Sequence, residues 1–291
     1  MHTDRAAVRP ALALLANALT WGLSWWPFRW LEAHGWHPLW ATVLVYSWVI
    51  LGMTLWRPSA WRELLSRPSL FWLVVAAGAT NASFNWAVTI GDVVRVVLLF
   101  YLMPLWAVAL ARWILREPLT GFAALRVALA LAGAAVVLWP QDGGRWPFPQ
   151  SLSDWLGVLG GFSFALNNVM LRREAHQPAQ ARLLAMFLGG AVVAGVTASA
   201  VGASAGVHAP VAWAWEPLVF SALVAWAFLG GNLALQYGAA RLPANATAVL
   251  MITEVLFASI SSVWWGSQVL TLQLCVGGTL IVAASLWVTR R

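Results

Sequence analysis

The residues best suited to bind a small molecule are one glutamate and several amides set within long apolar stretches. Glu254 lies in the sequence ITEVLFASI. A carboxylate at the centre of a bilayer costs several kcal/mol unless it faces a cavity or a partner. We therefore expect Glu254 to contact a substrate ammonium or to exchange a proton. The alternative is a neutral carboxyl group, hydrogen-bonded inside a helix bundle.

Two pairs of amide side chains are spaced by one helical turn. Asn81 precedes Asn85 by four residues and Asn232 precedes Gln236 by the same interval, so each pair shares one helix face. Amides offer donors and acceptors, and they can hold both charged groups of a zwitterion without a net charge. They can equally tie one helix to another. Both pairs are candidate substrate-binding residues, with helix-to-helix bonding as the alternative.

Aromatic and other side chains complete the predicted binding site. Trp21 and Trp86 lie deep in apolar runs beside polar residues, where an indole offers a flat apolar wall or a cation–π face. Packing and lipid contact are the alternative roles for both rings. The further candidates are Ser24, Tyr101, Met103, Asn167 and Tyr237.

Pro104 stands in the middle of the apolar run LLFYLMPLWAVALARWILREPLT, residues 98–120. Inside a helix, proline removes the hydrogen bond to the carbonyl four residues earlier, here that of Phe100, and clashes with the preceding turn. One interpretation is a structural kink whose free carbonyl is satisfied by neighbouring helices. The other is a hinge that bends between inward-open and outward-open states and exposes Tyr101 and Met103 to substrate.

The composition requires a membrane to surround these residues. The chain of 291 residues is 61% hydrophobic and only 9% charged, with a mean hydropathy of +0.75. A soluble fold of this size cannot cover that much apolar surface with polar groups. A bilayer core needs roughly 20 apolar residues per helical span, and the chain supplies many such runs. We predict an all-α integral membrane protein.

Ten transmembrane spans are predicted, with boundaries at Pro, Gly and Arg interruptions. The first is expected to be an uncleaved helix and not a signal peptide. On this topology only Arg29, Arg95 and Arg145 fall outside, and the remaining arginines lie in inside segments. The positive-inside rule then places both termini in the cytoplasm. The spans lie near residues 11–33, 38–56, 69–90, 94–114, 121–139, 154–174, 181–201, 214–238, 244–265 and 270–289.

We predict the contacts of two arginine side chains at the outer ends of spans. Arg29 and Arg95 are both expected to extend their side chains to the lipid headgroups. The alternative is that either attracts a carboxylate leaving the cavity. Arg95 follows Asp92 by three residues, and the two are expected to pair at the outer junction of two spans.

The polar, Gly/Pro-rich segment 141–153 divides the spans into five and five. Because five is odd, the second half enters the membrane in the opposite sense, which predicts two inverted repeats, residues 1–140 and 154–291. A shift of 151 residues pairs Asn81 with Asn232 and Met103 with Glu254. Inverted repeats with interrupted helices occur in many secondary transporters, whose substrate lies near the midplane.

Three local motifs resemble those of a known family of membrane proteins. They are Trp21-Gly22 in the first span, Pro104 followed by ILREPLT in the fourth, and ITEVLFASI in the ninth. Together they resemble the drug/metabolite transporter superfamily, in its EamA-like branch of two five-helix repeats. The resemblance implies a basket-like central cavity lined by spans 1, 3, 4, 6, 8 and 9. The sequence departs from the family pattern at Val255, where a proline is common, and at Gln268, where a glutamate often stands.

Three further stretches are most similar to bacterial exporters of aromatic and other amino acids. They are YLMP at residues 101–104, the run from Asn232 to Gly238, and the ending VGGTLIVAASLWVTRR. The resemblance implies a secondary transporter in the bacterial inner membrane that exports neutral and aromatic amino acids by alternating access. An exporter of amphipathic drugs or other small metabolites is the alternative.

Other classes of protein fit the sequence less well. An enzyme embedded in the membrane would ordinarily show clustered His, Asp or Cys, whereas the ten acidic residues and five histidines here are dispersed. The chain has no lysine, so it has no Walker-type nucleotide site, and we expect no ATPase subunit, cofactor, metal or nucleic-acid partner. Its single Cys275 can form neither an internal disulfide nor a zinc site, and we expect it to serve in packing. An assembly subunit would not need Glu254.

Overall fold

The computed structural model describes residues 3–114, 116, 121–139, 148–202, 207–208, 214–239, 241, 244–266 and 269–286. Within those ranges every regular element is a helix, as the composition predicts. Five of these helical stretches are long and apolar enough to cross a membrane, so the protein is a multi-pass membrane protein. They are Pro38–Trp56, Pro68–Ile90, Val93–Ile114, Ala179–Val201 and Trp215–Leu235.

The helices of the first half follow the predicted spans, with two of the spans divided. They are α1 (Thr3–Gly22), α2 (Trp25–Ala33), α3 (Pro38–Trp56), α4 (Ser59–Leu65), the short 3-10 helix η1 (Pro68–Leu70), α5 (Phe71–Ile90), α6 (Val93–Phe100), α7 (Met103–Ile114) and α8 (Gly121–Leu138). The second half contains α9 (Leu152–Arg173), α10 (Ala179–Val201), α11 (Trp215–Ala239), α12 (Ala244–Trp265) and α13 (Leu272–Leu286).

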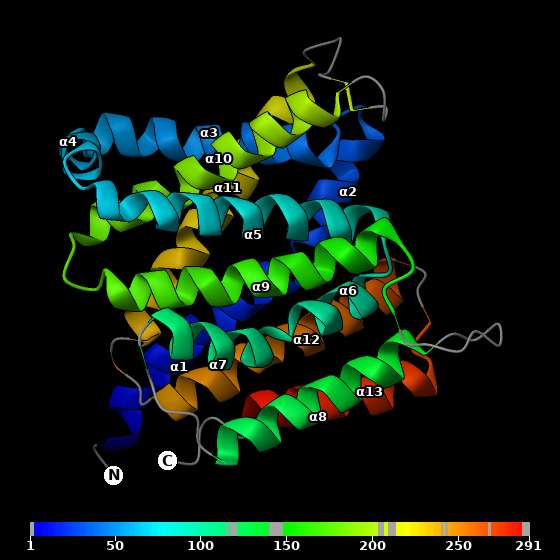
Figure 1. Cartoon of the computed structure of the whole chain (residues 1–291). Helices are drawn as coiled ribbons and strands as arrows, with labels where there is room; N and C mark the ends of the chain where they lie inside the picture. Colours follow the sequence, from blue (N-terminus) through cyan, green and yellow to red (C-terminus); the bar gives the residue numbers. More distant parts are fainter. Residues whose placement is uncertain are drawn as a thin grey trace.

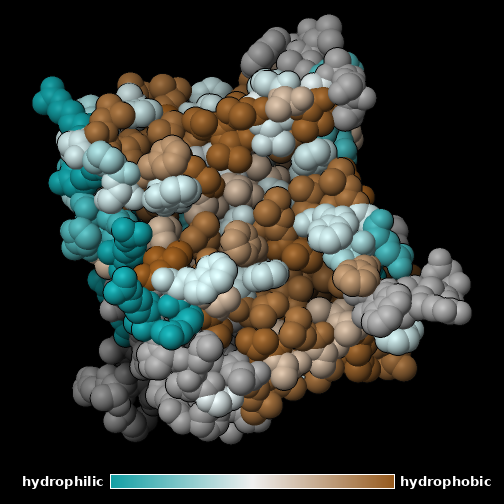
Figure 2. Space-filling model, in the orientation of Figure 1, coloured by the Kyte–Doolittle hydropathy of each residue, from teal (hydrophilic) through white to brown (hydrophobic). Residues whose placement is uncertain are grey.

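The long helices lie side by side, so the molecule has two ends (Figure 1). We call the end that carries α4 and the start of α1 the α4 end, and the opposite end, which carries α2 and the turn into α3, the α2 end. Hydrophilic side chains gather at the α4 end, whereas the surface over the helices is mainly hydrophobic (Figure 2). Arg62 of α4 and Arg173 at the close of α9 belong to this polar end.

Two predicted spans are each built from two consecutive helices. Residues 11–33 form most of α1 and all of α2, and residues 94–114 form α6 and α7. Between α6 and α7 the Leu102 amide donates to the Leu99 carbonyl and the Leu105 amide donates to the Leu102 carbonyl, which makes a tight turn. Pro104 therefore lies in the first turn of α7, where its missing N–H has no helical partner to lose.

The halves of the divided spans share some neighbours and differ in others. At the α2 end, α2 packs against α3 and α5, and α6 packs against α9 and α12. At the α4 end, α1 packs along α11 and α12, and α7 packs along α8 and α9. In the first span the main neighbours change at the break, whereas both halves of the fourth span pack against α8 and α9.

The central helices approach one another closely at glycines, because these residues have no side chain. A Cβ atom added at Gly78 of α5 would overlap the Gly189 carbonyl of α10, and one at Gly189 would overlap the carbonyl of Val74. Helices α5, α9, α10 and α3 pack together in this way, while α8 and α13 form a separate pair. That pair corresponds to the fifth and tenth predicted spans.

Candidate functional site

A cavity of about 100 Å³ lies among helices from both halves of the chain. A water molecule needs roughly 10–15 Å³ on the same measure, so this space holds several waters or part of a small solute. Its lining residues are Asn17, Trp21, Tyr46, Ala77, Thr80, Asn81, Phe84, Phe100, Phe164, Asn167, Met186, Phe187, Asn232, Leu235 and Glu254.

The cavity extends from the middle of the bundle toward the α4 end. On α9, α10 and α11 the lining residues are nearer to the α4 end than to the α2 end, for example Met186 in α10 and Leu235 in α11. On α3, α5 and α12 they lie near the middle of each helix. No lining residue belongs to α2, which covers the other end of the bundle.

Glu254 is the only acidic side chain among the described lining residues, and no arginine or histidine accompanies it there. Its side chain is 8% exposed and comes from the middle of α12. The Tyr101 hydroxyl, just after α6, donates a hydrogen bond to Glu254 Oε2 over 3.3 Å. Because a buried carboxylate is costly unless it is paired or protonated, this position suits a proton or a cationic ligand group.

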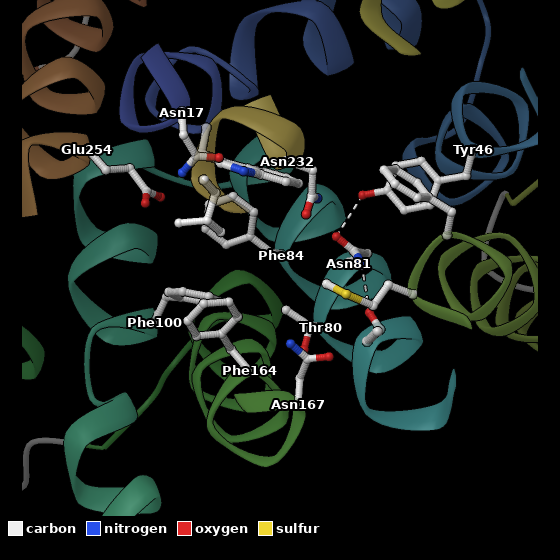
Figure 3. A pocket seen from close by; sticks show the side chains of 15 residues that line it. Asn17, Tyr46, Thr80, Asn81, Phe84, Phe100, Phe164, Asn167, Asn232 and Glu254 are labelled. Carbon is white, nitrogen blue, oxygen red and sulfur yellow. Dashed lines mark hydrogen bonds between the residues drawn. The ribbon is translucent and has the colours of Figure 1, made fainter. Parts of the chain in front are cut away.

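Four asparagines reach the cavity from four helices: Asn17 from α1, Asn81 from α5, Asn167 from α9 and Asn232 from α11 (Figure 3). The Asn167 side chain is buried, and its Oδ1 atom has no hydrogen-bond partner among the residues that the structure describes. A buried acceptor left unmatched costs about 1–3 kcal/mol. The cavity therefore offers a place where a ligand N–H or O–H group is favoured.

Asn81 is held by two hydrogen bonds. The Tyr46 hydroxyl donates to Asn81 Oδ1 over 2.6 Å, and Asn81 Nδ2 donates to the Ala77 carbonyl over 2.8 Å. Asn81 and Tyr46 lie across the cavity from Glu254 (Figure 3). The acidic group and this amide therefore occupy opposite sides of one space.

Aromatic rings form much of the remaining wall. Phe84 and Phe100 meet edge to face with centroids 4.9 Å apart, and Phe164 lies 5.2 Å from Phe100. Trp21 stacks on Phe228 at 4.8 Å. Such rings give a ligand a large apolar contact area.

Several of the predicted site residues meet here. Trp21, Asn81, Asn167, Asn232 and Glu254 all line the cavity. Tyr101 reaches it through its hydrogen bond to Glu254.

Other predicted residues lie outside the cavity lining. Ser24 donates to the Trp21 carbonyl, and Asn85 donates to Thr42 Oγ1 of α3. Met103 packs between the two large apolar clusters of the core. The side chain of Gln236 lies outside the described part of the structure.

Two predicted aromatic residues are also placed elsewhere. Trp86 meets the ring of His37 edge to face at 5.3 Å, near the α2 end. Tyr237 is exposed, and the Arg241 guanidinium lies 4.0 Å from the centroid of its ring. Neither ring lines the cavity.

Asn17, Tyr46, Phe84, Phe100 and Phe164 also line the cavity, although the sequence patterns did not predict them as site residues. Asn17 carried a signal, since it is a polar residue inside the first apolar run. The phenylalanines carried none, because apolar packing and ligand contact select the same side chain. The set of lining spans is also larger than the resemblance implied, because α3 contributes Tyr46 and α10 contributes Met186 and Phe187.

At the α2 end, Arg29 joins α2 to the final turn of α5. Its Nε donates to the carbonyls of Val88 (3.3 Å) and Thr89 (3.1 Å), and its Nη2 donates to that of Gly91 (2.5 Å). The last carbonyls of a helix lack intrahelical partners and attract cations. The expectation that Arg29 extends to the headgroups is therefore corrected, because helix α5 supplies its partners.

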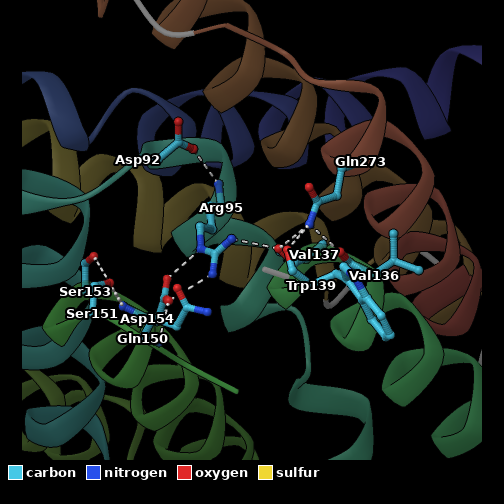
Figure 4. Close-up of polar contacts among 10 residues, drawn as sticks. All are labelled: Asp92, Arg95, Val136, Val137, Trp139, Gln150, Ser151, Ser153, Asp154 and Gln273. Atoms are coloured by element: carbon cyan, nitrogen blue, oxygen red, sulfur yellow. Dashed lines mark hydrogen bonds and ion pairs between the residues drawn. The ribbon is translucent and has the colours of Figure 1, made fainter. Parts of the chain in front are cut away.

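Arg95 is bound to Asp154 and not to Asp92, which corrects the second expectation for this end. Arg95 Nε and Nη2 donate to the two Asp154 oxygens over 2.7 and 3.0 Å, and Nη1 donates to the Val137 carbonyl (Figure 4). The Asp92 carboxylate instead accepts the backbone N–H of Arg95 and caps α6.

Comparison with known proteins agrees with this architecture. Residues 8–139 match the EamA-like transporter family. The match lies within the first half of the chain, and the first half is therefore similar to that family.

A curated relative is also described as a transporter. An uncharacterized transporter of Pseudomonas aeruginosa is 33% identical over 115 residues, which are 38% of this chain and 36% of the relative's own length. The match thus spans little more than a third of that relative.

A solved structure supports the fold over nearly the whole chain. A protein crystal structure aligns with a TM-score of 0.58 and 18% sequence identity, and the alignment covers 96% of both chains. At this identity the likeness concerns the fold alone. It extends the comparison to the second half of the chain, beyond the residues that match the family.

Proposed function

We propose that this protein is a secondary transporter that exports amino acids across the bacterial inner membrane by alternating access. Its substrates are aromatic and other neutral amino acids, in a broad range. The observation that carries the proposal is Glu254, the one carboxylate among the described lining residues, in a cavity whose wall is formed largely by amides and aromatic rings. Amides and aromatic rings suit neutral and aromatic amino acids, and the carboxylate suits their ammonium group.

The uneven packing of the two ends supports alternating access. At the α2 end, α2 packs against α5 and α6 packs against α12, and Arg29 joins α2 to α5. The cavity lies from the middle toward the α4 end. This arrangement fits the state closed on the α2 side. The state open on the α2 side would form when the divided spans bend at their breaks. Pro104 lies beside the joint between α6 and α7 and would be part of the hinge.

The proposed topology assigns the α4 end to the cytoplasm, with both chain termini on that side. The arginines of α4 and of the end of α9 then satisfy the positive-inside rule. Residues 1–140 and 154–291 form two inverted five-helix repeats joined by residues 141–153. In this scheme α1 with α2 corresponds to α9, and α6 with α7 corresponds to α12.

Flux measurements in proteoliposomes test the proposal. The purified protein is reconstituted, and the movement of a panel of labelled amino acids is measured with and without a pH gradient. We expect saturable flux of phenylalanine and other neutral amino acids that exceeds the flux into protein-free vesicles. Absence of flux for every amino acid tested would refute the substrate proposal.

A second candidate substrate class is amphipathic amines, including drugs. The rings of Trp21, Phe84, Phe100 and Phe164 favour it, because they provide apolar contact beside a carboxylate. The same vesicles distinguish the two classes when the panel includes an aromatic amine that lacks a carboxylate. Flux of the amine alone would favour this candidate over amino-acid export.

A further inference from the structure

Tyr46 controls which part of the Asn81 amide faces the cavity. Its hydroxyl donates to Asn81 Oδ1, while one N–H of Asn81 Nδ2 is used by the Ala77 carbonyl. A carboxamide has two N–H donors and one oxygen. With one N–H engaged, the donor that Asn81 has left for a ligand is its second N–H, and its oxygen, which already accepts from Tyr46, keeps only one lone pair.

The reverse orientation of this amide is unfavourable. If the amide were flipped, Asn81 Oδ1 would face the Ala77 carbonyl, which places two acceptors against each other. The hydroxyl of Tyr46 would then face the NH2 group and could no longer donate to Asn81. The two bonds together therefore select one orientation of the amide.

The ring of Tyr46 is firmly placed by its surroundings. Its side chain is only 1% exposed. It meets Phe187 and Phe228 edge to face at 5.3 and 6.3 Å, and a Cβ added at Gly190 of α10 would overlap the ring. The hydroxyl cannot move away from Asn81 without displacing these neighbours.

We infer that Tyr46 is a specificity-determining positioning residue that makes the Asn81 side of the cavity a hydrogen-bond donor. The inference rests on the proposed function and deepens it. Glu254 makes the opposite side an acceptor (Figure 3). A cavity with an acceptor at one side and a donor at the other fits a zwitterion, whose ammonium contacts Glu254 and whose carboxylate accepts from Asn81. An amine without a carboxylate leaves the Asn81 donor unmatched.

The test compares phenylalanine with phenethylamine, the same molecule without its carboxylate, as labelled substrates in proteoliposomes. For the unaltered protein we expect phenylalanine to have the higher kcat/KM. In Tyr46→Phe the ring and its packing remain, but Asn81 Oδ1 loses its donor and becomes available to the cavity. We expect the preference for phenylalanine to fall about tenfold, mainly through a higher KM for phenylalanine.

Two further variants keep the test decisive. Asn81→Asp places a carboxylate opposite Glu254, and we expect it to reverse the preference toward phenethylamine. Trp48→Phe is the matched control, because Trp48 lies on the same helix and donates to Ser221, away from the cavity. We expect it to preserve the preference of the unaltered protein.

The outcomes separate this inference from the proposed function. If the unaltered protein moves neither substrate, the proposed function fails. If it moves phenylalanine but Tyr46→Phe keeps the same preference, the role of Tyr46 is refuted. An equal loss of both substrates in Tyr46→Phe would also refute it, because such a loss reports a structural effect without discrimination.

Discussion

Loss of the Arg29 side chain is expected to open the α2 end of the bundle. In the structure its guanidinium uses two nitrogens to bind three carbonyls at the end of α5, and it lies 5.0 Å from the centroid of the Trp25 ring. Hydrogen bonds from a charged donor contribute about 1.5–3 kcal/mol each, and the partial exposure of Arg29 reduces this. We take about 2 kcal/mol for the group as a whole.

This free energy predicts how far the ratio of open to closed α2 ends changes when Arg29 is lost. Since about 1.4 kcal/mol corresponds to a factor of ten, Arg29→Ala should shift the ratio of open to closed α2 ends about 30-fold. The shift arises only if the bonds from Arg29 to α5 break when this end opens. Arg29→Lys keeps the charge but has a single nitrogen, so it should give a smaller shift.

Cysteine labelling measures this shift. Cys275 is the only cysteine of the chain and it is exposed, contrary to the expected packing role, so Cys275→Ala removes the background. Ala87 is fully buried on α5, and its carbonyl accepts the Gly91 amide. With Ala87→Cys as reporter, a membrane-impermeant maleimide added on the α2 side should react up to about 30-fold faster when Arg29→Ala is present.

Two results would refute this reasoning. Equal labelling rates with and without Arg29→Ala, at equal thermal stability, would show that Arg29 does not hold the α2 end closed. Faster labelling together with a lowered melting temperature would instead report partial unfolding. The Arg29→Lys variant separates the loss of charge from the loss of geometry.

Three further predictions concern other parts of the structure. Glu254→Gln keeps the shape of the side chain but removes its charge, so amino-acid flux should fall at least tenfold and lose its dependence on a pH gradient; unchanged flux at every pH would contradict the role of Glu254. Gly190→Ala places a Cβ against the Tyr46 ring, and it should destabilise the detergent-solubilised protein by about 1–3 kcal/mol, whereas Gly52→Ala, with open space around it, should not. Burial lowers the pKa of His37, whose Nδ1 accepts the Leu39 amide and caps α3. Its stabilising contribution should therefore be present above pH about 6.5 and lost as the pH falls through the lower pKa of the folded state. His37→Asn, which caps without titrating, should flatten that part of the melting-temperature profile, and an unchanged profile would contradict the assignment.

The positions of the helices could be predicted because the length of an apolar run directly reflects the thickness of the bilayer. The same was true of the break in the fourth span, since Pro104 disfavours a continuous helix there. The sequence could not show that Pro104 would lie in the first turn of α7, because this depends on where the preceding helix ends.

The candidate site was predictable only where a polar side chain stands in an apolar run. Glu254, Asn81, Asn167 and Asn232 gave such a signal, and all line the cavity. Asn85 gave the same signal and lies outside the lining, because α5 is surrounded on several sides and this residue meets Thr42 of α3. Spacing along one helix does not reveal which neighbour each turn will meet.

The contacts at the α2 end depended wholly on tertiary structure. The choice of Asp154 over Asp92 as the partner of Arg95 joins residues 59 positions apart, and no local pattern specifies it. Tyr46 was missed for a related reason. A tyrosine in an apolar span is ordinary, and its importance arises only from the Asn81 oxygen on another helix.

The joint between α6 and α7 lies one hydrogen bond away from the acidic group of the cavity. Tyr101 ends α6, and its hydroxyl is bound to Glu254. A ligand ammonium that takes the carboxylate competes with this hydroxyl, so its arrival changes the contacts of the residue at which the span changes direction. Ligand binding in the cavity and bending of the span therefore act on the same contact, the hydrogen bond between Tyr101 and Glu254. The two events are coupled directly, with no intervening residues.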